Sequence, residues 1–355
     1  ELEEDEGQVL FEAEQIIFER IDNGSYQISN LDGSNRHRFS PLHLNDTDRN
    51  GSGNGTYALT QVSDRHGNGY RIVYNEDTGL PHTVIDELGR EIWFEFDNLS
   101  PLTQIPVYRL TSMGSYNDNL PEGRELLVRY RYDDNGDLVA VEDAEGFVHR
   151  RFGYRRHMMI RHQTTAGLNT YYQYDHYTPQ GRVLRSHTDN GEEWRFAYAD
   201  GHTQITDALG RSEHLYYDHH GEVVKKVFAD GSSVLTERDA LGRPIKITDE
   251  MGRETRYRYN ECGLLTFVGG EGGQNQHIRY DQERRPVEIT LPHNQKTLIE
   301  YNEQGLPATQ SDSKGNATRY RYNENGQITQ ITDAKNNTYT FEYDQHHRLS
   351  TQTDC

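Results

Sequence analysis

The sequence predicts an all-β chain of tandem β-hairpin repeats that pair into one long, curved, spiralling antiparallel sheet. Three observations predict this fold: a tyrosine that returns every 21 residues, two turn motifs in each period, and a hydrophobic content of only 33%, which leaves little material for a solid core. A hairpin of this size does not bury its apolar face alone, so neighbouring hairpins must stack edge to edge.

Each period begins with an anchor tyrosine that is followed by a turn. Steps of 21 residues from Tyr217 fall first on Arg238 and then on tyrosines only. The turn reads Tyr-(Asp/Asn)-x-x-Gly, in which Asp or Asn caps the turn and Gly takes a positive φ. The anchors and turn glycines that we expect to define the repeat are Tyr217, Gly221, Tyr259, Gly263, Tyr280, Tyr301, Gly305, Tyr322, Gly326 and Tyr343.

A second turn lies about half a period away, as in Asp-Ala-Leu-Gly-Arg at 207–211 and Asp-Glu-Met-Gly-Arg at 249–253. The runs between turns are roughly six or seven residues long, which is a normal strand length. In the run 255–259, tyrosine alternates with arginine, so we expect tyrosines on one face, in cross-strand ladders, and arginines on the other. One repeat is therefore one β-hairpin.

Upstream of Tyr217 the same motifs continue with less regular spacing, and no linker separates two folding units. We therefore expect one continuous unit. Its regions are an irregular β N-terminal region at 1–56 with a polar loop at 45–56, a repeat array at 57–355 with regular repeats at 217–355, and an inserted loop at 98–125 that contains Pro101, Pro106 and Pro121.

Composition limits the architectures and the classes of partner that fit this chain. A net charge of −20 with few hydrophobic residues but 24 tyrosines favours a sheet one layer thick, in which tyrosine supplies contact area and a polar tip. A hollow shell or an extended solenoid fits this composition. An excess of 57 Asp and Glu over 37 Lys and Arg disfavours nucleic acid as a partner. No apolar run approaches the ~20 residues of a membrane helix, so we expect no membrane insertion by this segment.

Two cysteines, Cys262 and Cys355, do not make a disulfide framework, which favours synthesis in a reducing compartment. The acidic residues at 1–6 are the opposite of a signal peptide. The array stops in mid-period after Tyr343, and we expect the chain to be a fragment of a larger protein.

The sequence predicts no catalytic residue, cofactor or metal. The adjacent pairs His219-His220 and His346-His347 occupy turns and are poor chelators, because neighbouring residues face opposite ways. Nothing near Cys262 supplies a fixed base, so we interpret it as a solvated turn residue rather than a nucleophile. Single histidines such as His66 and His162 carry no recognisable catalytic motif.

One segment partly matches a calcium loop. Asp46, Asp48 and Asn50 are spaced as the first ligands of such a loop, and Gly51 follows them. Tyr57 stands where a bidentate Glu would complete the set. We therefore favour a polar loop over a cation site.

The two alternating motifs and their 21-residue period resemble the YD repeats of the Rhs (rearrangement hotspot) family. Upstream segments, including 57–97 and 152–175, resemble the N-terminal part of the core of bacterial Rhs effectors. The resemblance implies that the repeats form part of a hollow β-cocoon around a C-terminal toxin. It further implies type VI secretion, a role in interbacterial competition, and relatives among insecticidal toxin complexes and animal teneurins.

On this resemblance the partners are the remaining Rhs core and the enclosed toxin domain, with a secretion spike or chaperone contacted through other regions. The protein would occupy the bacterial cytoplasm before export and then be secreted or delivered to a target cell. The chain shows no PAAR-like spike, adaptor-binding membrane segment, self-cleavage motif or toxin domain, so it would be shell wall without cargo.

Two other functions remain open at this stage. Tyrosine-rich hairpins also stack on sugars, so the alternative is a carbohydrate-binding or cell-surface adhesion module with rings displayed outward in evenly spaced grooves. An enzyme would require titratable groups that converge in a pocket.

Overall fold

The computed structural model describes residues 7–11, 14–21, 24–31, 33–42, 56–99, 107–117, 120, 123–271 and 273–354. These residues contain 31 strands and one short 3₁₀ turn, η2 (Pro292–Asn294), but no α-helix. All the strands belong to a single antiparallel sheet. The predicted all-β fold is confirmed.

The strands follow one another along the chain with short turns between them. The first ten are β1 (Gln8–Phe11), β2 (Ile16–Arg20), β3 (Tyr26–Asn30), β4 (Arg36–Pro41), β5 (Tyr57–Ser63), β6 (Gly69–Tyr74), β7 (Pro81–Asp86), β8 (Glu91–Asn98), β9 (Tyr108–Tyr116) and β10 (Arg124–Tyr132). The next ten are β11 (Leu138–Asp143), β12 (Val148–Arg155), β13 (Met158–Gln163), β14 (Asn169–Tyr174), β15 (Val183–Thr188), β16 (Glu193–Ala199), β17 (His202–Asp207), β18 (Ser212–Tyr217), β19 (Val223–Val227) and β20 (Ser233–Arg238). The last are β21 (Pro244–Thr248), β22 (Glu254–Tyr259), β23 (Leu265–Gly270), β24 (Gln276–Tyr280), β25 (Pro286–Leu291), β26 (Gln295–Tyr301), β27 (Pro307–Asp312), β28 (Ala317–Tyr322), β29 (Ile328–Thr332), β30 (Thr338–Tyr343) and β31 (Leu349–Thr353).

Each strand pairs with the strand before it and the strand after it, so the sheet is a continuous meander. Within the described residues, β1 and β31 each pair on one side only, which leaves the sheet open. Strands β4 and β5 pair across the expected boundary at 56/57, with one register shift between Arg38 and Phe39. A single folding unit over both regions stays a prediction, which this pairing supports.

The expectation of an inserted loop at 98–125 is wrong in part. Strand β9 lies inside this segment and pairs with both β8 and β10. The prolines suggested a loop, but all three lie outside the strand, and its run of Thr, Ser, Met and Gly lacks a clear alternation. Most of the predicted polar loop at 45–56, together with Asp46, Asp48 and Asn50, lies outside the described residues.

Because successive strands run in opposite directions, the two turn motifs lie on opposite edges of the sheet. We call the edge with the turns after the anchor positions the anchor edge, and the other the mid edge. The anchor edge includes the turns at 75–79, 218–222, 239–243, 260–264, 281–285, 302–306, 323–327 and 344–348. The mid edge includes Gln15 and the turns at 64–68, 86–90, 143–147, 207–211, 249–253, 312–316 and 333–337.

Both motifs form the same five-residue turn, for which 207–211 is an example. The Asp207 Oδ1 atom accepts hydrogen bonds from the main-chain amides of Leu209 and Arg211, both at 2.9 Å. The fourth residue, Gly210, has a φ of +80°. Where glycine is missing at this position, Arg284, Asn336 and His347 take φ values of 59° to 68° instead. The turn thus requires a left-handed backbone conformation at its fourth residue, and glycine adopts this conformation with the least strain.

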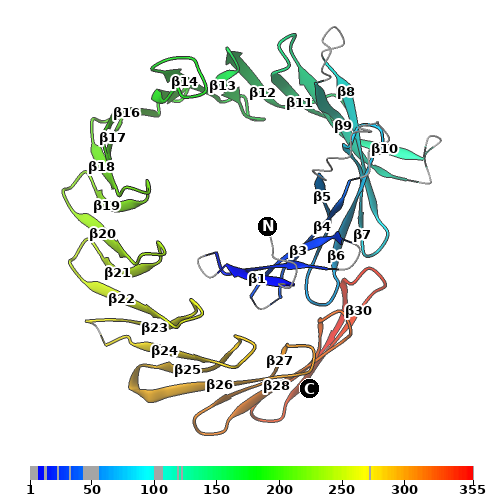
Figure 1. Cartoon of the computed structure of the whole chain (residues 1–355), viewed down its shortest axis with the longest axis vertical. Helices are drawn as coiled ribbons and strands as arrows, with labels where there is room; N and C mark the ends of the chain where they lie inside the picture. The colour runs from blue at the N-terminus through cyan, green and yellow to red at the C-terminus, as the bar shows by residue number, and fades with distance from the viewer. Residues whose placement is uncertain are drawn as a thin grey trace.

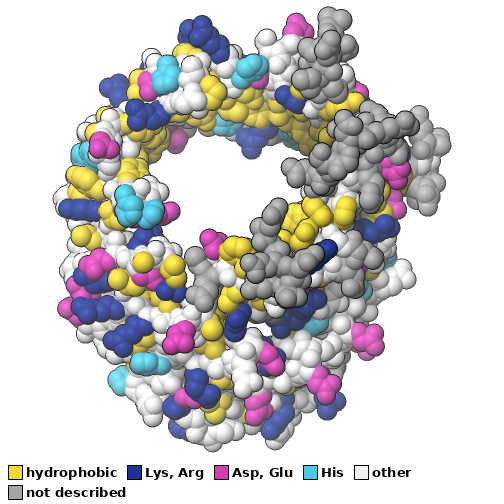
Figure 2. Space-filling model, in the orientation of Figure 1, with side chains coloured by type: hydrophobic (Ala, Val, Ile, Leu, Met, Phe, Trp, Pro, Cys, Tyr) yellow, Lys and Arg dark blue, Asp and Glu magenta, His cyan; other side chains and the backbone are white. Residues whose placement is uncertain are grey.

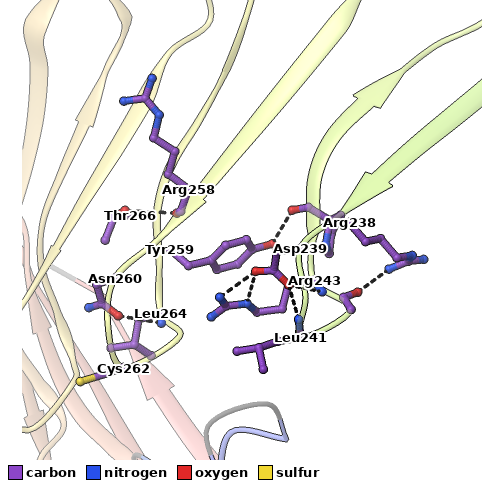
Figure 3. A network of polar contacts seen from close by, with 12 residues as sticks. Arg238, Asp239, Leu241, Arg243, Arg258, Tyr259, Asn260, Cys262, Leu264 and Thr266 are labelled. Atoms are coloured by element: carbon purple, nitrogen blue, oxygen red, sulfur yellow. Dashed lines mark hydrogen bonds and ion pairs between the residues drawn. The ribbon is translucent and has the colours of Figure 1, made fainter. Parts of the chain in front are cut away.

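The anchor tyrosines join one hairpin to the next. Tyr259, at the end of β22, donates a hydrogen bond through its hydroxyl to the main-chain oxygen of Pro244, 2.9 Å away in the preceding hairpin (Figure 3). The guanidinium of Arg243 lies over the tyrosine ring, 4.6 Å from its centre, and its Nε and Nη2 atoms each lie 2.7 Å from the Oδ2 atom of Asp239. The turn, its arginine and the next tyrosine therefore form one packed joint.

The joint recurs along the sheet. Hydroxyl-to-carbonyl bonds of 2.8 to 2.9 Å, each spanning 15 residues, are made by Tyr74, Tyr174, Tyr198, Tyr259, Tyr280, Tyr301, Tyr322 and Tyr343. Arg285 covers Tyr301 and Arg182 covers Tyr198 as Arg243 covers Tyr259. Arg238, at the one anchor position of the regular repeats without tyrosine, instead binds Gly242 O in its own turn, and its buried Nε has no partner.

The sheet bends because the register shifts by one residue at each anchor. Tyr259 pairs with Leu265 while Arg258 pairs with Phe267, so the strand after the turn carries one extra residue. The same shift precedes Tyr280, Tyr301, Tyr322 and Tyr343. A β-bulge at the same place in each of these repeats bends each hairpin in the same sense, so the bends add up. The strip curves into a ring that brings its first strands beside its last ones (Figure 1).

Side chains alternate across this one-layer sheet. Tyr320 and Tyr322 are half-buried whereas Arg319 and Arg321 are exposed, as expected for opposite faces. The expected tyrosine ladders are wrong, because Tyr320 pairs with Ile331 and Tyr322 with Ile328, so each tyrosine packs on an aliphatic residue. Among the described residues only Trp93 and Ala140 are buried hydrophobics. Figure 2 shows hydrophobic side chains along the inner rim of a hollow ring.

Replacing Tyr259 by Phe removes the hydroxyl that binds Pro244 O. We expect this change to lower the free energy of unfolding by about 1 kcal/mol, the usual net value of one hydrogen bond. Tyr257→Phe is the matched control, because Tyr257 lies on the same face two residues away and its hydroxyl makes no hydrogen bond to the described residues. Urea unfolding measures the difference. Equal losses for the two variants would show that the joint does not depend on the hydroxyl.

Candidate functional site: the wall and its seam

The two ends of the strip meet at a seam, where the mid edge of the first strands lies against the anchor edge of the last ones. Three side chains of the mid edge donate hydrogen bonds to main-chain oxygens of anchor-edge turns. Gln15 Nε2 binds Cys262 O at 3.1 Å, Arg65 Nη1 binds Gly305 O at 3.1 Å, and Asn68 Nδ2 binds Asn325 O at 3.0 Å. These partners are 240 to 257 residues apart, so one circuit of the ring takes about twelve repeats.

The turn glycines of the anchor edge allow this close approach. A Cβ atom at Gly263 or Gly305 would collide with Gln15 Nε2 or Arg65 Nη1, and one at Gly326 would lie 2.8 Å from the ring of His66. Gly221 occupies the equivalent position in a turn away from the seam, where a Cβ would have nothing within 4 Å. Glycine at the seam therefore provides both the positive φ of the turn and the room for the facing edge.

The histidines are parts of the wall. His162 stacks between Phe152 and Tyr172, with its ring 6.4 Å from each, and His202 stacks on His214 with their nitrogens 3.0 Å apart. His219 and His220 pack on each other in the turn at 218–222. His347 Nε2 lies 3.0 Å from Asn325 Nδ2, beside the seam, and His346 lies in the same turn as His347. Within the described strands and turns, no three His, Cys, Asp or Glu side chains are placed to hold a metal ion.

Cys262 is half-buried in the turn at 260–264, and its main-chain oxygen is a seam acceptor. The structure thus brings Cys262, Gly305 and Gly326 together with the first strands. It leaves Tyr217 and Gly221 away from this contact. No helix of the described residues has the length and apolar character needed to cross a membrane.

The turn carboxylates are held in their charged form. Burial by itself raises the pKa of Asp239, but hydrogen bonds from the side chain and amide of Arg243 and from the amide of Leu241 lower it below its usual value. The amide of Arg348, followed by its side chain, lowers the pKa of Asp344 to about 2. The ionised carboxylate is the acceptor that the turn requires.

Comparison with known proteins places this geometry in a family. The RHS repeat family model matches residues 238–274, 301–338 and 322–354, and all three ranges begin at anchor positions. The chain is 31% identical over 257 residues to the toxin protein Tse5 of Pseudomonas aeruginosa, across 68% of this chain. This chain is an Rhs-repeat protein.

A second relative of this Rhs chain is the double-stranded DNA deaminase toxin A of Burkholderia cenocepacia, 38% identical over 97 residues and 27% of this chain. The chain spans 17% of the length of Tse5 and 7% of the length of the deaminase toxin. Among solved structures, TcdB2-TccC3 without its hypervariable C-terminal region is 13% identical, with a TM-score of 0.49 over 96% of this chain and 23% of that one.

The sequence did not indicate which side chains make contacts across the Rhs seam. Gln15, Arg65, His66 and Asn68 belong to turns that look like any other, and their partners are more than 200 residues away. Our prediction also missed the arginine that ends some anchor turns and packs over the ring of the next tyrosine. For that arginine a signal exists, since Arg243 and Arg285 both stand one residue before Pro at the start of the next strand.

Alanine at Gly326 tests the seam. Gly326 has a φ of +77° and Gly221 one of +83°, so alanine costs about 1 kcal/mol of left-handed strain at either position. At Gly326 the new methyl also displaces His66, and we expect a further loss of about 1 kcal/mol from overpacking. Thermal unfolding of Gly326→Ala and Gly221→Ala measures the difference. Equal melting temperatures would contradict the contact between the two edges.

We expect acid to lower the stability of the chain by protonating the aspartates of its turns. Their aspartates have lowered pKa values in the folded chain, so stability is fully present above the ordinary value of 3.8 and is lost as the pH falls toward about 2. Thermal unfolding followed from pH 7 to pH 2 should therefore show a plateau down to about pH 4 and then a decline. A loss already complete between pH 7 and pH 5 would point to the histidines and contradict this assignment.

Proposed function

We propose that this chain is a segment of the wall of an Rhs-type shell, which encloses a C-terminal toxin polypeptide for delivery by a type VI secretion system. The observation that carries the proposal is the seam. A strip that returns to its own first strands and binds them through Gln15, Arg65 and Asn68 surrounds a space instead of covering a surface. The toxin names of two relatives agree with a part in a toxin.

The wall has no catalytic role in this proposal. The turn aspartates with lowered pKa values, such as Asp239, Asp312 and Asp344, are spread along both edges, where they cap turns. Glu193, Glu254 and Glu288 lie on strands, where hydrogen bonds from arginine and lysine side chains lower their pKa values. A container acts by keeping solvent and partners away from its contents, so it requires a continuous surface more than a reactive group. The remaining core, the enclosed toxin and a delivery spike or chaperone are the partners, and the protein passes from the bacterial cytoplasm to a target cell.

Binding of sugars is less well supported. The rings that repeat every 21 residues are half-buried, their hydroxyls bind main-chain oxygens, and arginines cover Tyr198, Tyr259 and Tyr301. Stacking on a sugar requires an open ring face. The periodic tyrosines are therefore committed to joining hairpins.

Protection of a cargo tests the enclosure. A short unfolded reporter polypeptide is fused after Asp354, and its digestion by protease is compared with that of the free reporter. We expect protection in the original fusion and its loss when residues 280–300, one full period, are deleted, because Gly305 and Gly326 then shift by one hairpin relative to Arg65 and Asn68. The control Cys262→Ser, which keeps the length of the strip and the seam oxygen, should retain protection.

Two results would contradict the proposal. One is a reporter digested equally fast in the free and the fused form. The other is a purified chain that turns over a small substrate and loses this activity on substitution of one side chain.

A further inference from the structure

One joint of the regular repeats lacks its tyrosine. It lies between the anchor-edge turns at 218–222 and 239–243, where Arg238 stands at the anchor position. The last residue of the first turn also differs, because Glu222 stands where the next turn has Arg243, which lies over the ring of the following tyrosine. A carboxylate and a guanidinium thus replace the guanidinium and the ring of a complete joint. We call this place the incomplete joint.

The incomplete joint leaves a cavity between its two turns. An oxygen of Glu222 lies 3.5 Å from Nη2 of Arg238, well beyond the ~2.8 Å of a charge-assisted hydrogen bond, and 59% of the Glu222 side chain is exposed. The cavity has a volume of about 1000 Å³, which is enough for a small-molecule ligand. The apolar and aromatic residues of its lining include Val224, Leu241, Ile245, His219 and His220.

The guanidinium of Arg238 is fixed at one end and open at the other. Its Nη1 atom donates a hydrogen bond to Gly242 O at 2.9 Å (Figure 3). Its Nε atom is buried and has no hydrogen-bond partner among the described residues. In Arg243 the matching Nε and Nη2 atoms each lie 2.7 Å from a carboxylate oxygen of Asp239. Arg238 therefore presents, without a close partner, the pair of donors that binds carboxylates elsewhere in this wall.

An aromatic ring would match the rest of the cavity. The imidazole rings of His219 and His220 lie with their centres 3.8 Å apart, and the side chains of Leu241 and Ile245 are exposed. Arginines of complete joints lie 4.5 and 4.6 Å from the centre of a tyrosine ring, whereas Arg238 covers no ring of the described residues. A planar ring in the cavity would gain apolar and cation–π contacts that the incomplete joint lacks.

The other acidic side chains of the cavity are already held by partners. Asp218 and Asp239 accept hydrogen bonds from main-chain amides of their own turns. Glu237 forms an ion pair with Lys246. Glu222 is left as the competitor for the guanidinium, and because its carboxylate is exposed it can turn into solvent when a ligand enters.

We propose that the incomplete joint is a binding site for a small aromatic carboxylate. The carboxylate binds Nε and Nη2 of Arg238 in place of Glu222, and the ring occupies the cavity between the turns. The ligand thus supplies the ring that a tyrosine supplies in the complete joints, and its binding stabilises the wall at this place. This inference goes beyond the proposed function, because such a ligand would bind whether or not the shell encloses a toxin.

Three probes separate the two halves of this recognition. 4-Hydroxyphenylacetate carries both a ring and a carboxylate, acetate lacks the ring, and 4-hydroxyphenylethanol lacks the charge. Isothermal titration calorimetry with the full chain measures the three affinities. We expect 4-hydroxyphenylacetate to bind about tenfold tighter than either of the others, since a charged hydrogen bond and a stacked ring each contribute on that scale.

Arg238→Tyr is the sharpest variant, because it places the missing tyrosine in the cavity. The new hydroxyl would reach Val223 O, which precedes it by the same 15 residues that separate Tyr259 from Pro244. We expect binding to be lost while the melting temperature stays the same or rises, so the loss would not reflect unfolding. Arg321→Tyr is the matched control, since Arg321 is exposed on a strand of another repeat, and it should keep the original affinity.

Two further variants test the same groups without filling the cavity. Arg238→Gln removes the pair of donors and should weaken the binding of 4-hydroxyphenylacetate about tenfold. Glu222→Gln removes the competing charge and should tighten it. Equal affinities for the three probes, or unchanged binding of 4-hydroxyphenylacetate in both Arg238 variants, would overturn the site. These titrations use no cargo, so their outcome is separate from that of the protection assay.

Discussion

The hydrogen bond from anchor tyrosines such as Tyr259, Tyr301 and Tyr322 to the main chain of the preceding hairpin is the interaction on which this structure depends. A sheet one layer thick has almost no buried hydrophobic side chains, here Trp93 and Ala140 among the described residues, so ordinary core packing does not hold its hairpins at a fixed angle. The tyrosine supplies a large ring for contact and a hydroxyl that fixes its distance to the neighbour. With Arg243 or Arg285 above the ring, the joint is both packed and charged.

Curvature follows from the same position in the repeat. The β-bulge lies next to the anchor, so the residue that joins two hairpins also marks where the strand bends. Where the period stays at 21 residues, over 217–355, the bends have the same direction, and the strip returns to its start. The seam then requires only small side chains on one edge and donors on the other, which Gly305 and Arg65 provide.

Much of the fold could be predicted from the sequence because its determinants are local. The order of turns, the hairpins and the positive φ at residues such as Gly263 and Gly326 follow from motifs of five residues. Strand β9 could not be found, because the prolines around it are stronger signals than its own weak alternation. The seam could not be predicted either. Nothing in the turn at 64–68 shows that Arg65 faces Gly305, since this pairing depends on the sum of about twelve bends, and a small error in each would move the partner by a full hairpin.

Cross-linking across the seam is the most direct test of this account. Gln15→Cys places a thiol beside Cys262, whose main-chain oxygen accepts a hydrogen bond from Gln15. Replacement of Cys355 by Ser then leaves the new cysteine and Cys262 as the only two thiols in the chain. The matched control also carries Gln15→Cys, but it combines Cys262→Ser with His220→Cys. His220 is the third residue of the turn at 218–222, as Cys262 is of the turn at 260–264, and it lies away from the seam. The account predicts rapid intramolecular cross-linking of the Gln15→Cys chain by a short bismaleimide, seen as altered migration on a denaturing gel, and none in the control. Absence of the cross-link in the first chain, or equal yields in both, would contradict a strip that closes on itself at this seam.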